Sequence, residues 1–147
     1  MLVAAVFSSP RAAGPTDWPQ FRGYEAAGLA DQFTLPSTWS ATDNVAWATA
    51  IPGRGWSSPV ILGREIWMTT ANPKGTELSV VCVERDSGKI IHDQKIFDVE
   101  APQFAHEFNS YASPTPVIEV GRLYASWGLS RKVALPTGSR MVPVCVS

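Results

Sequence analysis

The stretch SPVILGREIW, residues 58–67, returns 57 positions later as TPVIEVGRLY, residues 115–124. Each copy is a short apolar run, a Gly-Arg pair and a second run that ends in an aromatic residue, which is the pattern of a β-hairpin. The glycines, Gly63 and Gly121, are out of step by one position. A hairpin that recurs at a fixed spacing is typical of β-propellers and solenoids, because one small sheet cannot bury both of its faces alone.

Around the first copy, four runs have strand-like composition. They cover residues 57–62, 65–70, 78–84 and 89–97, and turn-forming residues separate them. Four antiparallel strands joined by tight turns form one propeller blade or one meander sheet. Residues 45–49 alternate in the manner of a half-buried strand, which predicts a further strand upstream. No stretch shows helical periodicity, so the sequence predicts an all-β protein.

The second copy supplies strands at 115–120 and 122–127, and after Gly128 its pattern is lost in a Pro-interrupted tail. We therefore expect a partial β-propeller of about one and a half four-stranded antiparallel blades, whereas a closed propeller has roughly four to eight. A truncation or a frameshift near Gly128 would explain the loss. The expected division is a signal remnant or unstructured segment (1–16), an incomplete repeat region (17–128) and an atypical tail (129–147).

An incomplete second sheet would leave an unpaired strand edge at residues 122–127, which favours self-association. The expected partners are the missing blades or another protein. The formal net charge of −1 gives no electrostatic reason to expect nucleic acid as a partner. No apolar run approaches the roughly 20 residues of a membrane-spanning helix.

The first seven residues, MLVAAVF, are apolar, and small residues and Arg11 follow them. This layout is typical of the end of a secretory signal, although a basic segment before it is lacking and the apolar run only reaches the lower limit of about 7 residues. A start site assigned too far downstream would account for this. We expect export to the periplasm or the cell exterior, with a floppy N-terminus as the alternative.

Three blocks of the chain resemble the β-propeller proteins built from pyrroloquinoline-quinone (PQQ)-type repeats, in particular exported bacterial members. The blocks are WPQFRG (18–23), GWSSPV (55–60) and NSYASPTPV (109–117). In the repeat signature of that family, Gly88 matches the turn glycine, and His92 stands where a Trp docks on the neighbouring blade. Trp47 resembles such a docking Trp, contributed by the preceding segment.

This resemblance implies a non-catalytic interaction scaffold as the first functional hypothesis. The alternative is the N-terminal part of a PQQ-dependent dehydrogenase, which would need PQQ and calcium. The chain has no adjacent Cys pair of the kind that such enzymes often carry, and no carboxylates spaced as a calcium loop. No cofactor is therefore predicted. A third possibility is a glycan-binding module that uses exposed Trp faces.

Individual reactive residues favour structural roles. Ser57, Ser58 and Ser113 are outside any G-x-S-x-G elbow and are expected to form turn hydrogen bonds. His106 and Glu107 are neighbours that point to opposite sides of an extended chain. No catalytic or metal-binding residue is therefore predicted.

Aromatic residues near the two Ser-Pro motifs are the candidates for a binding surface. Trp56 and Tyr111 precede these motifs at matching places, and in a ring the innermost strands begin near the central channel. Together with Arg54 they are predicted to form a ligand-facing surface, and packing is the alternative for them.

The two cysteines show no metal-ligand spacing. Cys82 lies inside an apolar run and is expected to be a buried free thiol. A disulfide between Cys82 and Cys145 stays open as the alternative.

Overall fold

The structure, a computed structural model, describes residues 14, 16–31, 34–128, 131–137 and 144–145. The described residues form a 3-10 turn, η1 (Tyr24–Ala26), and the following strands: β1 (Val60–Leu62), β2 (Glu65–Ala71), β3 (Glu77–Glu84), β4 (Ile90–Asp98), β5 (Val117–Glu119), β6 (Arg122–Trp127), β7 (Arg131–Pro136) and β8 (Val144–Cys145). The prediction of an all-β protein is confirmed. In the part of the chain that is described, no helix has the length and apolar content required to span a membrane.

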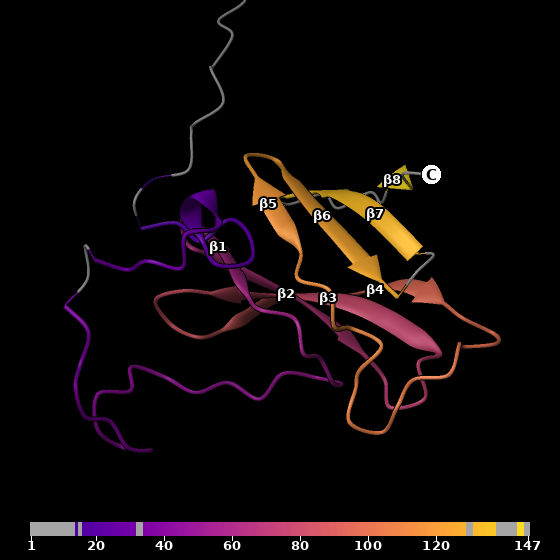
Figure 1. Ribbon diagram of the computed structural model, residues 1–147, viewed down its shortest axis with the longest axis horizontal. Coiled ribbons are helices and arrows are strands. Elements are labelled where there is room, and N and C mark those ends of the chain that lie inside the picture. Colours follow the sequence, from indigo (N-terminus) through magenta and orange to yellow (C-terminus); the bar gives the residue numbers. More distant parts are fainter. Residues whose placement is uncertain (1–13, 15, 32–33, 129–130, 138–143, 146–147) are drawn as a thin grey trace, which may run out of the picture.

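The strands form two separate antiparallel sheets, each in chain order, β1-β2-β3-β4 and β5-β6-β7-β8. Figure 1 shows the second sheet standing across one end of the first. The two repeated hairpins have the same register, because Val60 pairs with Trp67 and Val117 pairs with Tyr124. The repeat in the sequence thus corresponds to one hairpin in each sheet.

The second sheet continues past Trp127, contrary to the expectation of half a sheet. Strand β7 pairs with β6 along its whole length, from Arg122 opposite Pro136 to Trp127 opposite Arg131, and the two-residue strand β8 pairs with β7. The predicted unpaired edge at 122–127 is therefore wrong. Within β7, Lys132 is exposed and Val133 and Leu135 are buried, which is the alternation of a half-buried strand.

The turns of the two hairpins explain why the glycines are out of step. The two-residue turns lie at 63–64 and 120–121, so the turns themselves keep the 57-residue spacing. Gly63 takes the first turn position with φ 61°, and Gly121 takes the second with φ 81°. A positive φ is needed once in each turn, and glycine supplies it without steric cost.

The core lies between the sheets and receives side chains from both. Its buried members are Val60, Trp67, Ala71, Leu78, Val80, Cys82, Ala112, Ile118, Leu123, Ala125, Trp127, Val133 and Leu135. Trp127 joins the sheets directly: its ring lies edge-on to Phe97 of β4, with centroids 5.8 Å apart, and its Nε1 donates to Thr70 O at 3.3 Å. Each sheet thus buries its apolar side chains against the other sheet, which neither could do alone.

The WPQFRG segment lies against the first strand of each sheet. Trp18 exchanges two backbone hydrogen bonds with Ile61 of β1, both 2.8 Å, and Pro19 O accepts a hydrogen bond from Ile118 N of β5 at 2.9 Å. Because β1 also lies against β5, this segment connects the two sheets at the place where they meet.

The predicted strand at 45–49 is wrong, because these residues join neither sheet. Figure 1 shows the segment running past the first sheet. The alternation in its sequence serves a different contact: Trp47 and Thr49 reach the β3–β4 turn, where Trp47 Nε1 donates to Arg85 O at 2.8 Å and Thr49 Oγ1 donates to Gly88 O at 2.5 Å. Two side chains attach this segment where the sequence predicted a ladder of backbone hydrogen bonds.

Candidate functional site

Two segments that precede the repeated hairpins lie side by side. Trp56 N and Ser57 N both donate to Ala112 O, at 3.0 and 3.1 Å, and Ser110 Oγ donates to Arg54 O at 3.1 Å. Gly55 lets the first segment lie close to β2, since a Cβ at that position would lie 2.6 Å from Thr69 O. The predicted site residues are thus carried on neighbouring segments.

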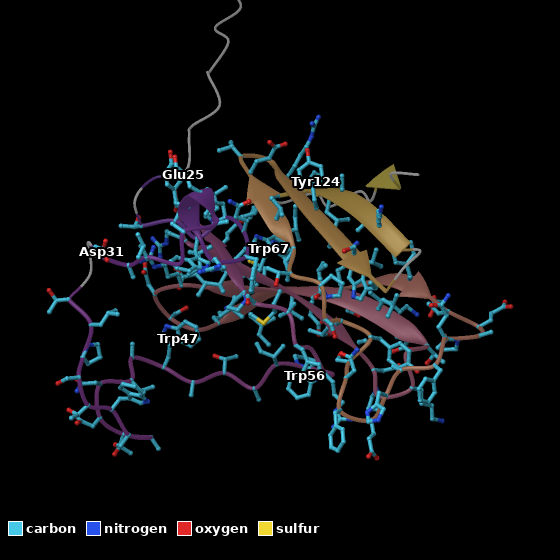
Figure 2. The ribbon with its side chains drawn as sticks, in the orientation of Figure 1. Glu25, Asp31, Trp47, Trp56, Trp67 and Tyr124 are labelled. Atoms are coloured by element: carbon cyan, nitrogen blue, oxygen red, sulfur yellow. The ribbon has the colours of Figure 1, made fainter. Side chains whose placement is uncertain are left out.

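Arg54 and Trp56 line one hollow, of about 380 Å³, over the end of β2. Arg54 belongs to an isolated bridge with Ala71, and Trp56 is 61% exposed. Figure 2 shows Trp56 at the lower margin of the molecule, away from Trp67 in the core. Both candidate side chains are therefore accessible to a ligand.

Tyr111 lines a different hollow, of about 480 Å³, and neither Arg54 nor Trp56 lines it. Its half-buried ring packs over Gly75, where an added Cβ would lie 2.6 Å from the ring. With a repeat of 57 positions Tyr111 corresponds to Arg54, and not to Trp56. The predicted matching of Trp56 with Tyr111 is therefore off by two positions, and the structure does not gather the three residues around one hollow.

The connection from β4 to β5 forms most of the wall around Tyr111. The lining is Gly75, Leu78, Val99, Ala101, Pro102, Gln103, Phe104, Ala105, His106, Asn109, Ser110, Tyr111, Ser113, Pro114, Trp127 and Gly128. None of these residues is Asp, Glu, Lys or Arg. Apart from Tyr111, the sequence did not predict this lining, although the length of the connection after β4 was a usable signal, because long loops often carry binding residues.

Of the three serines, Ser113 forms a turn hydrogen bond of the kind that the sequence predicts, whereas Ser57 and Ser58 bond to residues of other segments. Ser57 Oγ donates to Thr69 O at 3.4 Å, the backbone amide of Ser58 donates to Thr115 Oγ1 at 3.1 Å, and Ser113 Oγ donates to Ser110 O at 2.7 Å. These bonds hold the segments before β1 and β5 in place.

The histidines lie far apart in the chain and have different surroundings. His106 stacks on Phe108 with centroids 5.2 Å apart, and its Nδ1 accepts a hydrogen bond from Phe108 N at 3.3 Å. His92 stacks on Trp67 with centroids 5.5 Å apart and planes 10° apart. The position where the repeat signature carries a docking Trp is thus used for packing within the sheet.

Cys82 lies in β3 between the strands that carry Trp67 and His92, and is register partner to both. It is a buried free thiol. Burial, with a smaller contribution from the charge of Glu65, raises the pKa of this thiol to about 12, which makes it a poor nucleophile. The side chain of Cys145 lies outside the described residues.

The strongest charge cluster fixes the β3–β4 turn. Glu84 accepts hydrogen bonds from the amide and hydroxyl of Ser87, at 2.7 and 2.6 Å, and from Arg64 Nη2 at 2.7 Å. Arg64 also pairs with Asp86 at 3.1 Å. The bonds from Ser87, followed by that from Arg64, lower the pKa of Glu84 to about 2. Glu84 ends β3 and the other three groups lie on turns at the same end of the first sheet, so the cluster stabilises the shape of that end.

Within the described ranges, no group of three or more His, Cys, Asp or Glu residues is placed to hold a metal ion. Comparisons of the chain with protein-family models, with curated proteins and with solved structures give no match. The fold and the two hollows are therefore the features that bear on function.

Proposed function

We propose that the two sheets are consecutive blades of a β-propeller of the PQQ-type repeat kind, and that the protein acts as a non-catalytic interaction scaffold. The observation that carries the proposal is that residues at the same position of the two repeats contact each other. Ser58 binds Thr115 and Thr70 binds Trp127, and the members of each pair are 57 residues apart. Copies related by rotation bring equivalent residues together only near the rotation axis.

The arrangement of the strands supports the same proposal. The first strands, β1 and β5, lie against each other, as the innermost strands of neighbouring blades do. Trp47 packs its ring over Gly88 of the β3–β4 turn, which is the kind of contact that a docking Trp makes in the resembled family. Export, which rests on residues 1–13 outside the described ranges, is part of this proposal.

The ring arrangement is tested by an experimental structure of the protein. Superposition of β1–β2 on β5–β6 should need a rotation of between about 45° and 90° about an axis beside β1, the step of an eight- to a four-bladed ring. A rotation of about 180°, which turns the same face of both hairpins inward as in a two-layer sandwich, would identify a sandwich and overturn the propeller.

The scaffold role is tested by photo-crosslinking in the native cell. A photoreactive amino acid in place of Trp56, beside the inner strands, should yield an adduct of one defined mass. The same amino acid in place of Asp93, exposed on the outer strand β4, should not. Identical adducts at both positions, or dye-linked alcohol or sugar oxidation by the protein after addition of calcium and PQQ, would contradict a non-catalytic scaffold.

A further inference from the structure

We propose that the hollow of about 480 Å³ beside Tyr111 is a binding site for a neutral carbohydrate. Its volume lies in the range of small-molecule sites, roughly 300–1,000 Å³. The site is formed by two sheets and the connection between them, so it does not depend on closure of a ring. It therefore goes beyond the scaffold role.

The lack of acidic and basic side chains in the described lining favours an uncharged ligand. Among the side chains that the structure describes, no Asp, Glu, Lys or Arg lines the hollow, although the whole chain contains 25 of these residues. An anionic ligand would find no lysine or arginine to pair with among these residues, and a cationic ligand no carboxylate. Phosphorylated and carboxylated compounds are thus disfavoured, since a charge needs a partner when it leaves water.

Two of the aromatic residues that line the hollow differ in exposure, and the exposed ring is the one that a ligand can cover. Trp127 lies at the floor and is 2% exposed, whereas Phe104 in the β4–β5 connection is 91% exposed. A phenyl ring that is almost wholly in water gains free energy when a ligand covers it. The C–H face of a sugar ring provides such a cover.

Polar groups around these faces are available to bind hydroxyls. Asn109 uses Oδ1 to accept from Ser110 N at 2.8 Å, which orients its amide and leaves Nδ2 as a donor. Among the described residues, the amide of Gln103 and the hydroxyl of Tyr111 have no hydrogen-bond partner. Amides and hydroxyls offer both donors and acceptors, and sugar hydroxyls need both. Aromatic faces with uncharged donors and acceptors therefore favour a carbohydrate.

The test is titration calorimetry of the purified chain with the neutral disaccharides cellobiose, maltose and N,N′-diacetylchitobiose, with adenosine as a neutral aromatic competitor. We expect at least one disaccharide to bind with a Kd of about 10 μM to a few mM, the range for a small ligand in a half-open site. No heat with any disaccharide at about 20 mM, or binding of adenosine alone, overturns the carbohydrate assignment.

Variants locate the site. Phe104→Ala should weaken binding about tenfold through lost apolar cover. Asn109→Asp keeps the accepting oxygen but replaces the Nδ2 donor with a charge, and should weaken binding at least as much. Phe21→Ala is the matched control, because Phe21 is also an exposed phenylalanine, at 59%, and does not line the hollow. Unchanged melting temperatures show that the variants fold, and an equal loss with Phe21→Ala overturns the site.

Discussion

The backbone amide of Ser58 donates a hydrogen bond to the hydroxyl of Thr115 at 3.1 Å, and the two residues hold the same position in their respective repeats. The bond lies just before β1 and β5, at the point where the two sheets meet. A side chain of one copy thus satisfies a backbone group of the other, in a place where the sheet ladders have not yet begun. Repeated residues therefore form a bond between the two sheets, in addition to the hairpin within each sheet.

The Thr115 hydroxyl should contribute measurably to stability. Thr115→Val keeps the shape of the side chain and leaves the half-buried Ser58 amide without its acceptor. We expect a loss of about 1 kcal/mol in the free energy of unfolding, measured by urea titration with circular dichroism. Thr34→Val, on the exposed segment before residue 47, is the control and should change the free energy by less than about 0.5 kcal/mol. Equal effects would show that the bond between the sheets is unimportant.

The contact between Trp47 and Gly88 gives a second prediction. Gly88 has φ 71°, and an added Cβ would lie 2.5 Å from the indole of Trp47, whereas Gly63, with φ 61°, has no atom within 4 Å of such a Cβ. Gly63→Ala should cost only the backbone strain, about 1–2 kcal/mol. Gly88→Ala should cost at least about 1 kcal/mol more, because the indole must move.

Both glycine variants can be compared by urea unfolding and tryptophan fluorescence. The emission of Trp47 should shift to longer wavelength in Gly88→Ala, as the ring leaves its hydrogen bond to Arg85 O and becomes exposed. Gly63→Ala should keep the emission of the unchanged protein. Similar stabilities and spectra for the two variants would mean that Trp47 does not dock on the turn in solution.

The sequence predicted the hairpins well because their signals are local. Alternation and turn glycines placed Arg122–Trp127 without error and β2, β3 and β4 within one residue at each end. Strand β7 was missed although Val133 and Leu135 alternate with Lys132 and Ala134, since the adjacent Gly and Pro residues hid the pattern. Residues 45–49 show the opposite case. Their sequence alternates as in a strand, but they form no strand, and the alternate residues Trp47 and Thr49 contact the β3–β4 turn instead.

The candidate site was predicted only in part, for a geometric reason. Arg54, Trp56 and Tyr111 lie on neighbouring segments, as expected, but the hydrogen bonds between those segments turn Trp56 and Tyr111 toward different hollows. The ring of Tyr111 packs over Gly75, which is distant from it in the sequence. A sequence repeat can predict where a segment lies, but tertiary packing determines the direction in which its side chains point.

Acid should weaken the first sheet through Glu84. Its folded pKa is lowered to about 2, so the stabilisation by its carboxylate is present above the ordinary value of roughly 4.3 and is lost as the pH falls toward 2. The melting temperature should therefore fall between about pH 4.5 and 2, and Glu84→Gln should flatten this fall. Glu100→Gln removes an exposed carboxylate after β4 and should keep the original slope. An unchanged slope in Glu84→Gln would contradict the role of the turn cluster.

The Cys82 thiol should be protected by the rings of Trp67 and His92. Because its folded pKa is raised to about 12, the folded state holds the proton longer than the unfolded chain does, and stability should fall as the pH rises above the ordinary value of roughly 8.5. In a Cys145→Ser background, an aromatic disulfide reagent at pH 8 should react with Cys82 only after unfolding in urea.

Removal of one covering ring tests this protection directly. His92→Ala removes the ring of the register partner of Cys82 and should speed the reaction of the thiol with the reagent at least tenfold, since local opening then exposes the sulfur more readily. Asp93→Ala changes the next residue of the same strand, on the opposite and exposed face, and should leave the rate unchanged. If the two variants react at the same rate, the stack of His92 on Trp67 does not close the core over Cys82, and the thiol is reached only by opening of the whole sheet.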